Sequence, residues 1–229
     1  MNPVFCAIDT PHLSEAEALV ESLRGKVGGI KLGLEFFMAH GPAGYRAIAA
    51  KGFPIFLDVK LHDIPNTVAG AVSSLLSLKP AFITIHASGG AAMLRAAADA
   101  AAKAGTARPK LLAVTALTSL DGADLAAVGQ DDDAGRQVMR LATLAKDNGI
   151  DGAICSPEEI PALREALGKD FILMVPGIRP SWAAANDQKR VMTPKQARDA
   201  GASYLVIGRP ITKAANPSEA AQLVATELA

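Results

Sequence analysis

The sequence predicts an α/β fold, a single-domain (β/α)8 TIM barrel in which eight parallel strands close into a ring surrounded by helices. The chain has 229 residues, within the range of one domain and near the ~250 typical of this barrel. Short runs rich in Val, Ile, Leu and Phe recur along the whole length, with helical patterns between them. Near-continuous apolar strands that alternate with helices indicate a parallel sheet covered by helices. No linker or low-complexity tract divides residues 1–229.

The apolar runs provide eight candidate strands, which favours closure into a barrel over an open doubly wound sheet. The expected strands are Val4–Asp9, Gly29–Gly33, Pro54–Lys60, Ala81–Ala87, Lys110–Leu117, Gly152–Cys155, Phe171–Pro176 and Ser203–Gly208. The turn after the first strand reads Asp9-Thr10-Pro11-His12 and contains no GxGxxG pattern. A dinucleotide-binding Rossmann fold is therefore not favoured.

Helical patterns fill most of the segments between these strands. The expected helices are Ser14–Arg24, Thr67–Leu78, Gly90–Ala104, Gly135–Asn148, Pro157–Leu167 and Pro217–Leu228. Ser14 with Glu17 three residues later fits a capping box, and Ser156 precedes a proline at the first helical position. Two connections, Thr118–Asp133 and Arg179–Thr193, are longer and more polar than the others, which is typical of functional loops.

Composition argues against several classes of partner and location. The chain has 23 basic and 23 acidic residues and 4% aromatics, so it lacks the basic excess or stacking side chains of a nucleic-acid binder. Cys6 and Cys155 lie in apolar runs without a CxxC pair, and we expect buried small hydrophobes with no disulfide and no metal. No secretory signal and no apolar run near the ~18 residues of a membrane span are visible. We expect a cytoplasmic location and no membrane partner.

Charged residues interrupt the apolar strands at their carboxyl ends. Asp9 ends the first strand, Lys31 lies in the second, and Asp58 and Lys60 end the third. Side chains alternate between the two faces of a strand, so Asp58 and Lys60 point the same way, into the barrel with Phe56. The same parity directs Asp9 and Lys31 inward.

Four ionisable groups are thus expected to meet at the mouth of the barrel where such folds keep their active sites. For any one of them, a structural ion-pair network is as good an interpretation as a catalytic role. Burying several ions is costly, and barrel interiors are usually filled by apolar side chains. The set together therefore favours a catalytic cluster.

Glycine and arginine follow the last two strands. Gly177 and Arg179 come after the seventh strand, and Gly208 and Arg209 after the eighth. Barrel phosphate sites are commonly formed by these two loops. Glycine permits close backbone approach, and the arginine fork matches phosphate oxygens. The sequence therefore predicts a phosphate site there.

The segment LDVKLHDIPNTV (Leu57–Val68) resembles the orotidine 5′-monophosphate decarboxylase family of bacterial type. Its DxKxxD core is shared with a wider barrel superfamily, whereas the IPNT extension is more specific. The resemblance covers nearly the whole chain without a departure at any motif position. The other motifs are AIDT, KLGLEFF (Lys31–Phe37), TIHASGG (Thr84–Gly90), VTALTSL (Val114–Leu120), VPGIRP, NDQKRVMTP (Asn186–Pro194) and VIGRPIT.

The resemblance implies decarboxylation of orotidine 5′-monophosphate to UMP and CO2, the last step of de novo UMP synthesis, by a homodimer with shared active sites and no cofactor. The implied catalytic array is Lys31, Asp58, Lys60 and Asp63, with Lys60 as proton donor. By the same resemblance, Asp63, Ile64 and Thr67 reach into the neighbouring subunit's site. The implied substrate contacts are Asp9, Lys31 and Thr67 on the ribose, Thr118 on the pyrimidine, and Arg179, Gln188, Gly208 and Arg209 on the phosphate.

The reaction explains why a buried lysine would be needed. Loss of CO2 from C6 of orotate leaves a carbanion that cannot delocalise into the ring, and no site for a coenzyme electron sink is visible in the sequence. The Lys60 ammonium can stabilise the developing negative charge and then protonate it. Asp58 and Asp63 would favour the charged form of this lysine.

Two other functions stay open from the residues alone. One is a Mg²⁺-dependent decarboxylase or aldolase of the same DxKxxD superfamily that acts on a sugar phosphate. The other is a non-catalytic phosphate-binding barrel. His86 is expected to face inward as a structural histidine and His62 to face away from the site, and Asp131-Asp132-Asp133 is expected to cap a helix rather than bind metal.

Overall fold

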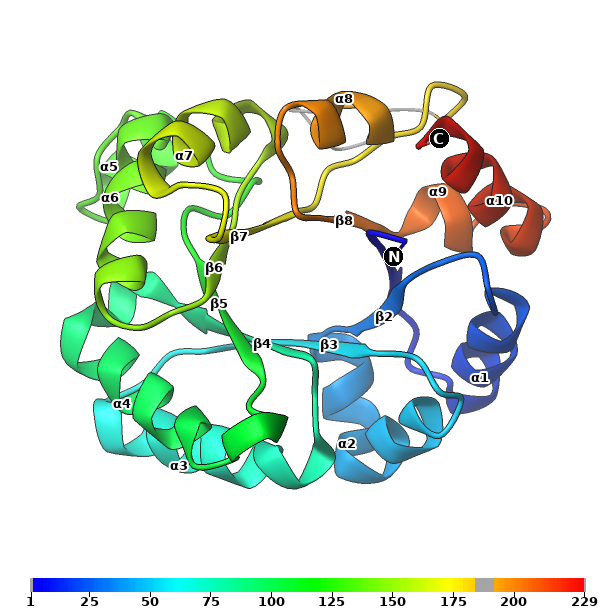
Figure 1. Ribbon diagram of the computed structural model, residues 1–229, viewed down its shortest axis with the longest axis horizontal. Coiled ribbons are helices and arrows are strands. Elements are labelled where there is room, and N and C mark those ends of the chain that lie inside the picture. The colour runs from blue at the N-terminus through cyan, green and yellow to red at the C-terminus, as the bar shows by residue number, and fades with distance from the viewer. Residues whose placement is uncertain (1, 184–191, 229) are drawn as a thin grey trace.

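Eight strands form a closed ring with helices outside it, as Figure 1 shows for the computed structural model. The structure describes residues 2–183 and 192–228. The strands are β1 (Val4–Ile8), β2 (Gly29–Leu32), β3 (Ile55–Leu61), β4 (Phe82–His86), β5 (Lys110–Val114), β6 (Gly152–Ile154), β7 (Ile172–Val175) and β8 (Tyr204–Ile207). Every neighbouring pair is parallel, and β8 pairs with β1. The predicted (β/α)8 barrel is confirmed.

Helices follow the strands along the chain and cover the outside of the ring (Figure 1). The α-helices are α1 (Leu13–Ser22), α2 (Leu34–Ala49), α3 (Pro65–Leu75), α4 (Gly90–Ala102), α5 (Gly122–Ala127), α6 (Ala134–Asp147), α7 (Ile160–Leu167), α8 (Pro194–Asp199), α9 (Arg209–Thr212) and α10 (Pro217–Glu227). Short 3-10 turns are η1 (Leu76–Leu78), η2 (Ala87–Gly89), η3 (Gly105–Ala107) and η4 (Pro157–Glu159). The six predicted helices are present.

Four helices were not predicted from the sequence, and α2 is the longest of them. Its helical pattern is broken by Gly41 and Pro42, and Gly41 has a φ of 53° that places a kink inside the helix. Helices α5 and α8 are six residues each, with α5 inside the first long connection and α8 directly after the second, and α9 has only four residues. Short or interrupted helices carry too few turns for a clear apolar period.

The expected capping box at Ser14 is wrong. Helix α1 begins at Leu13, with His12 at the N-cap position and no side-chain cap. The Thr10 hydroxyl instead accepts a hydrogen bond from the His12 amide at 3.3 Å and donates to Glu15 at 2.7 Å. The prediction at Ser156 is confirmed, because η4 starts at Pro157 and runs directly into α7.

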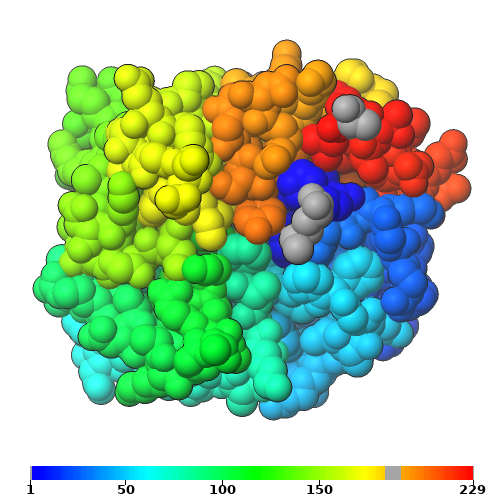
Figure 2. Space-filling view, viewed as in Figure 1, coloured from blue at the N-terminus to red at the C-terminus, as the bar shows by residue number. Residues whose placement is uncertain are grey.

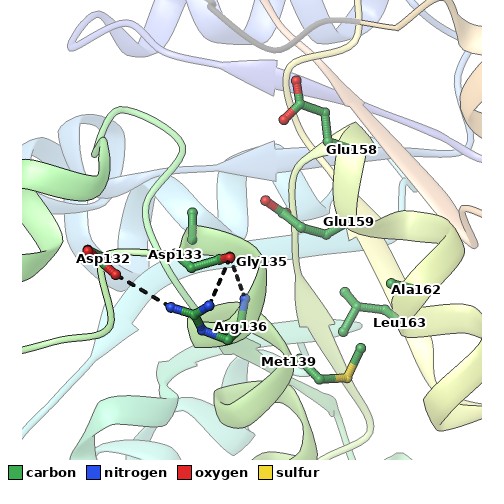
Figure 3. A pocket seen from close by; sticks show the side chains of 10 residues that line it. Asp132, Asp133, Gly135, Arg136, Met139, Glu158, Glu159, Ala162 and Leu163 are labelled. Atoms are coloured by element: carbon green, nitrogen blue, oxygen red, sulfur yellow. Dashed lines mark hydrogen bonds and ion pairs between the residues drawn. The ribbon is translucent and has the colours of Figure 1, made fainter.

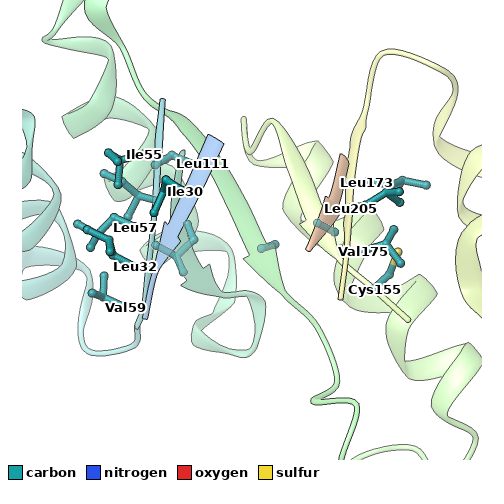
Figure 4. Close-up of a cluster of buried hydrophobic side chains, with 14 of the residues drawn as sticks. Ile30, Leu32, Ile55, Leu57, Val59, Leu111, Cys155, Leu173, Val175 and Leu205 are labelled. Carbon is teal, nitrogen blue, oxygen red and sulfur yellow. The ribbon is translucent and has the colours of Figure 1, made fainter. Parts of the chain in front are cut away.

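Apolar side chains form two separate layers, one on each face of the strands. The outer layer packs between strands and helices, and in Figure 4 the side chains of Ile55, Leu57 and Val59 lie together on one side of β3. The inner layer fills the ring. Its buried members are Phe5, Ala7, Phe56, Phe82, Leu112, Met174 and Val206.

Aromatic rings dominate the inner layer. Phe5 packs edge-to-face against Phe82 and Tyr204, with ring centroids 5.4 and 5.5 Å apart. Figure 2 shows atoms covering the centre of the ring on the face that carries the start of the chain. The parity predicted for β3 is therefore confirmed: Phe56 faces the interior, and its neighbours Ile55 and Leu57 face the helices.

Both cysteines are buried and unpaired. Burial in the apolar layer raises the pKa of both thiols, so neither is ionised at neutral pH. Among the described residues, no helix combines the length and the apolar character that crossing a bilayer requires.

Candidate active site

A cavity of about 430 Å³ opens at the carboxyl ends of the strands. Four charged side chains from β1, β2 and β3 or the turns after them line one part of it, as the parity of the strands predicts. These residues are Asp9, Lys31, Asp58 and Lys60. Another part is lined by residues that follow β7 and β8, namely Pro176, Gly177, Arg179, Gly208 and Arg209. The two groups therefore line one cavity.

The four charged side chains form a continuous network. Lys31 Nζ lies 3.1 Å from an oxygen of Asp9 and 3.7 Å from Asp58 Oδ2. Lys60 Nζ lies 2.8 Å from Asp58 Oδ1. Asp58 therefore stands between two ammonium groups, and its side chain is only 13% exposed.

Asp58 is ionised despite its burial. Burial alone would raise the pKa of this carboxyl group, but Lys31 and Lys60 oppose that effect, and hydrogen bonds from Lys60 and Thr84 add to them. The balance lowers the pKa of Asp58 below its usual value. The site therefore holds a fixed negative charge between two cations at neutral pH.

The backbone of Lys60 has an unusual conformation for a lysine. Its φ is 50°, in the left-handed region, which costs a residue with a side chain about 1–2 kcal/mol. The register between β3 and β4 shifts between Leu57 and Leu61, so Lys60 lies in a bulge. Such strain persists only where surrounding contacts enforce it, and it is concentrated at functional sites.

The opposite part of the cavity is suited to an anion. Gly177, which follows β7, has a φ of 78°, a conformation that favours glycine. Arg179 is buried and Arg209 begins α9, and both line the cavity. Thr118, the predicted pyrimidine contact, lines it as well. Gln188 lies outside the described residues.

Lys213 lines the same cavity and was missed by the sequence analysis. It lies four residues after Arg209, and its amide donates to the Arg209 carbonyl at 3.0 Å. Residues four apart on a helix share a face. The spacing of Lys213 from Arg209 could therefore have indicated that both side chains point to the same site.

Three predicted residues do not reach this cavity within one chain. Asp63, Ile64 and Thr67 are exposed and are absent from its lining. The Asp63 carboxylate accepts a hydrogen bond from the Ile64 amide at 2.6 Å instead. Three of the four members of the predicted array are therefore assembled by the single chain, and Asp63 is not.

The two histidines of the motifs form a stacked pair beside the site. The rings of His62 and His86 have centroids 5.1 Å apart and an interplanar angle of 26°. Neither ring lines the cavity. Burial lowers the pKa of His86, and His62 and Lys60 lower it further against the opposing effect of Asp58. His86 is thus a packed, neutral ring.

The acidic run before α6 caps that helix, as predicted. Asp133 accepts a hydrogen bond from the Arg136 amide at 3.0 Å, and the Arg136 side chain lowers the pKa of Asp131 to about 2. Figure 3 shows Asp132 and Asp133 directed at Arg136, at the edge of a second cavity of about 650 Å³ between α6 and α7. Among the described residues, no group of three or more His, Cys, Asp or Glu side chains has the geometry of a metal site.

A closed (β/α)8 ring with a charged cavity at the carboxyl ends of its strands is the architecture of a barrel enzyme. The sequence profile of the orotidine 5′-phosphate decarboxylase / HUMPS family matches residues 2–224, and the chain belongs to this family.

Curated relatives extend over the whole chain. The orotidine 5′-phosphate decarboxylase of Paramagnetospirillum magneticum is 56% identical over 232 residues, covering 100% of this chain and 99% of the relative. The decarboxylase of Rhodospirillum rubrum is 51% identical, covering 99% and 94%. Among solved structures, the orotidine 5′-phosphate decarboxylase of Lactobacillus acidophilus superposes with a TM-score of 0.88 at 37% identity, covering 100% of this chain and 99% of that one. The chain is accordingly an enzyme of the carboxy-lyase class.

Proposed function

We propose that the protein decarboxylates orotidine 5′-monophosphate to UMP and CO2, the last step of de novo UMP synthesis, in the cytoplasm and without a cofactor. The observation that carries this proposal is the ion pair of 2.8 Å between Lys60 and Asp58 in a cavity that Arg179 and Arg209 also line. Relatives 51% and 56% identical over nearly their full length have the same name, which supports the choice of substrate.

The two parts of the cavity suggest one orientation for the nucleotide. Arg179, Arg209 and the backbone at Gly208 would hold the phosphate, because an arginine fork matches phosphate oxygens. Asp9 and Lys31 would bind ribose hydroxyls, and Thr118 would contact the pyrimidine. Gln188 would add a further phosphate contact. The reacting carbon would then lie beside Lys60.

Lys60 would act on the electron pair that decarboxylation leaves behind. The C6–carboxylate bond breaks, CO2 departs, and the bonding electrons stay on C6 in an orbital that lies in the plane of the ring. The ammonium of Lys60 stabilises this charge and donates a proton to C6, which yields UMP and a neutral lysine that regains a proton from water. A side chain fixed by Asp58 needs little rearrangement during this step.

Asp58 would have two effects. Its fixed charge orients Lys60, as the 2.8 Å contact indicates. It would also lie near the departing carboxylate and repel it, a ground-state effect to which we give less weight because destabilisation of this kind is contested.

The proposed active unit is a homodimer with shared sites. Asp63, Ile64 and Thr67 are exposed at the mouth side of the barrel, after β3 and at the start of α3. Ile64 is 67% exposed, so its apolar side chain is available to pack against a partner subunit. In the partner's site, Asp63 would supply the second carboxylate next to Lys60, and Thr67 a ribose contact.

A spectrophotometric assay with orotidine 5′-monophosphate tests the proposal. We expect the wild-type protein to consume the substrate, with and without EDTA, and Lys60→Ala to be nearly inactive. Activity that disappears with EDTA would instead indicate the metal-dependent sugar-phosphate chemistry of the wider superfamily. Binding of UMP without any turnover would indicate a non-catalytic phosphate-binding barrel.

A further inference from the structure

Thr84 connects the strained lysine to the buried carboxylate. It lies on β4, two residues before His86, and its side chain is fully buried. Its hydroxyl accepts a hydrogen bond from the backbone amide of Lys60 at 2.9 Å and donates one to Asp58 Oδ1 at 3.0 Å. The same carboxylate oxygen accepts a hydrogen bond from Lys60 Nζ at 2.8 Å.

These contacts form a closed ring of three residues. The backbone of Lys60 is held to Thr84, Thr84 to the carboxylate of Asp58, and the carboxylate to the Lys60 ammonium. The ring fixes both ends of Lys60, the backbone and the charged tip, against one buried hydroxyl. A threonine hydroxyl can do this because it accepts and donates at the same time.

This ring of hydrogen bonds forms where the pairing of β3 with β4 is irregular. Lys60 has a φ of 50°, and the register between β3 and β4 shifts between Leu57 and Leu61. A regular ladder would satisfy the Lys60 amide with a backbone carbonyl of the neighbouring strand. Here the Thr84 side chain satisfies it, so the bulge and the hydroxyl depend on each other.

We infer that Thr84 is a positioning residue for the proton donor, whose hydroxyl holds the backbone of Lys60 in its left-handed conformation and the Asp58 carboxylate in the orientation that fixes the lysine tip. Thr84 is absent from the cavity lining, so it acts through its two partners and not on the substrate. The kinetic consequences of this inference rest on the proposed decarboxylation.

The first test compares Thr84→Val, which keeps the shape and removes the hydroxyl, with Thr84→Ser, which keeps the hydroxyl. For Thr84→Val we expect kcat to fall roughly 10- to 100-fold, the range for losing a hydrogen bond to a charged group, with UMP affinity nearly unchanged. Thr84→Ser should stay within a few-fold of wild type. The matched control is Thr115→Val. It removes a buried hydroxyl just after the next strand, β5, that donates to the Ile154 carbonyl at 2.9 Å.

The pH profile separates positioning from general loss of packing. The hydrogen bond from Thr84 helps to lower the pKa of Asp58, whose other charged or titratable neighbours are Lys31, Lys60 and His86. Without that bond the carboxylate binds a proton at higher pH, so the acid limb of kcat/KM should move upward in Thr84→Val. It should stay in place in Thr84→Ser and Thr115→Val.

Two kinetic results would overturn the inference: wild-type turnover and pH profile in Thr84→Val, or an equal loss in Thr84→Ser and Thr84→Val. Crystal structures of wild type and Thr84→Val decide the point independently of turnover. We expect the Lys60 backbone to leave the left-handed region, or its amine to move from Asp58, in the valine variant. An unmoved Lys60 would overturn the inference even if the natural substrate proved to be another phosphate ester.

Discussion

Asp58 and Lys60 are separated by one residue on β3, and their side chains meet on the inner face of the barrel with an O–N distance of 2.8 Å. On a regular strand, residues two apart point the same way without being held together. Here the bulge at Lys60 and the Thr84 hydroxyl bring donor and carboxylate into direct contact. The lysine thus has its counter-ion on its own strand, before any substrate or partner arrives.

Asp58→Asn should reduce kcat by about 100-fold or more, the scale seen when one preorganised electrostatic group is removed from an active site. The amide keeps the size of the side chain but leaves Lys31 and Lys60 without their shared anion. Steady-state kinetics with orotidine 5′-monophosphate measures the effect. Asp151→Asn is the matched control, because this carboxylate is also held by two cations, Arg108 and Lys110, but outside the cavity. Similar losses of turnover in both variants would contradict a specific role for Asp58.

Substrate that lacks the phosphate should lose turnover as well as affinity. Binding energy from a remote group can be used to assemble the site around the reacting carbon. We expect orotidine to show a kcat lower by about 100-fold or more than its 5′-phosphate. Saturation kinetics with both compounds measures the difference. A raised KM with unchanged kcat would mean that the phosphate serves binding alone.

Lys213→Met should weaken phosphate binding modestly. Lys213 is exposed and lines the cavity one helical turn after Arg209. An exposed charge contributes up to ~1 kcal/mol, so KM should rise roughly 5-fold at low salt and less at high salt. Arg209→Met should raise it more, and the surface variant Lys103→Met should not change it. A KM for Lys213→Met that equals the wild-type value at low salt would remove this residue from the phosphate site.

Mixing two inactive variants tests the shared site. Lys60→Ala and Asp63→Ala proteins should each be nearly inactive as proposed. After subunit exchange, mixed dimers contain one site with both Lys60 and Asp63 intact, so up to about half of the mixed dimer's sites regain function. Recovery is measured as activity after mixing and compared with each variant alone. No recovery after exchange has been verified would mean that Asp63 serves its own chain.

His86 should make the protein less stable as the pH falls below about 6.5, its usual pKa. Burial, His62 and Lys60 lower the folded-state pKa, so the unfolded chain takes up a proton first. The related stability is complete above pH 6.5 and is lost as the pH falls toward the folded-state pKa. Urea unfolding at pH 7 and pH 5 should show a smaller loss for His86→Phe than for wild type. His12→Asn, at an exposed position, should lose as much as wild type; equal losses in all three proteins would contradict the assignment.

The strands and their inward faces were predictable because the signals are local and repeated. Each buried strand is a short apolar run, and parity alone assigns Phe56, Asp58 and Lys60 to the interior. Helix α2 was missed because Gly41 and Pro42 interrupt its pattern. The start of α1 was misplaced because Thr10 and Glu15, on either side of Ser14, form a local hydrogen bond that the helix-capping pattern does not describe.

The sequence predicts those residues of the candidate site that lie at the ends of strands. The left-handed conformation of Lys60 has no sequence signal, since lysine has no preference for it. The hydrogen bonds to Thr84 depend on the shift in register between β3 and β4, which the sequence also does not indicate. Asp63, Ile64 and Thr67 could be related to the site only through family resemblance. Their side chains are exposed and do not line the cavity of their own chain. The alternation of side chains along a strand therefore could not assign them to the site.

The aromatic layer of Phe5, Phe56, Phe82 and Tyr204 seals the barrel below the charged network. Among the described residues, these aromatic side chains close one end of the barrel interior, and the charged cavity lies at the other end. In the proposed reaction, nucleotide, carbon dioxide and water would therefore enter and leave on the same side of the barrel, so slow departure of UMP would delay entry of the next substrate molecule.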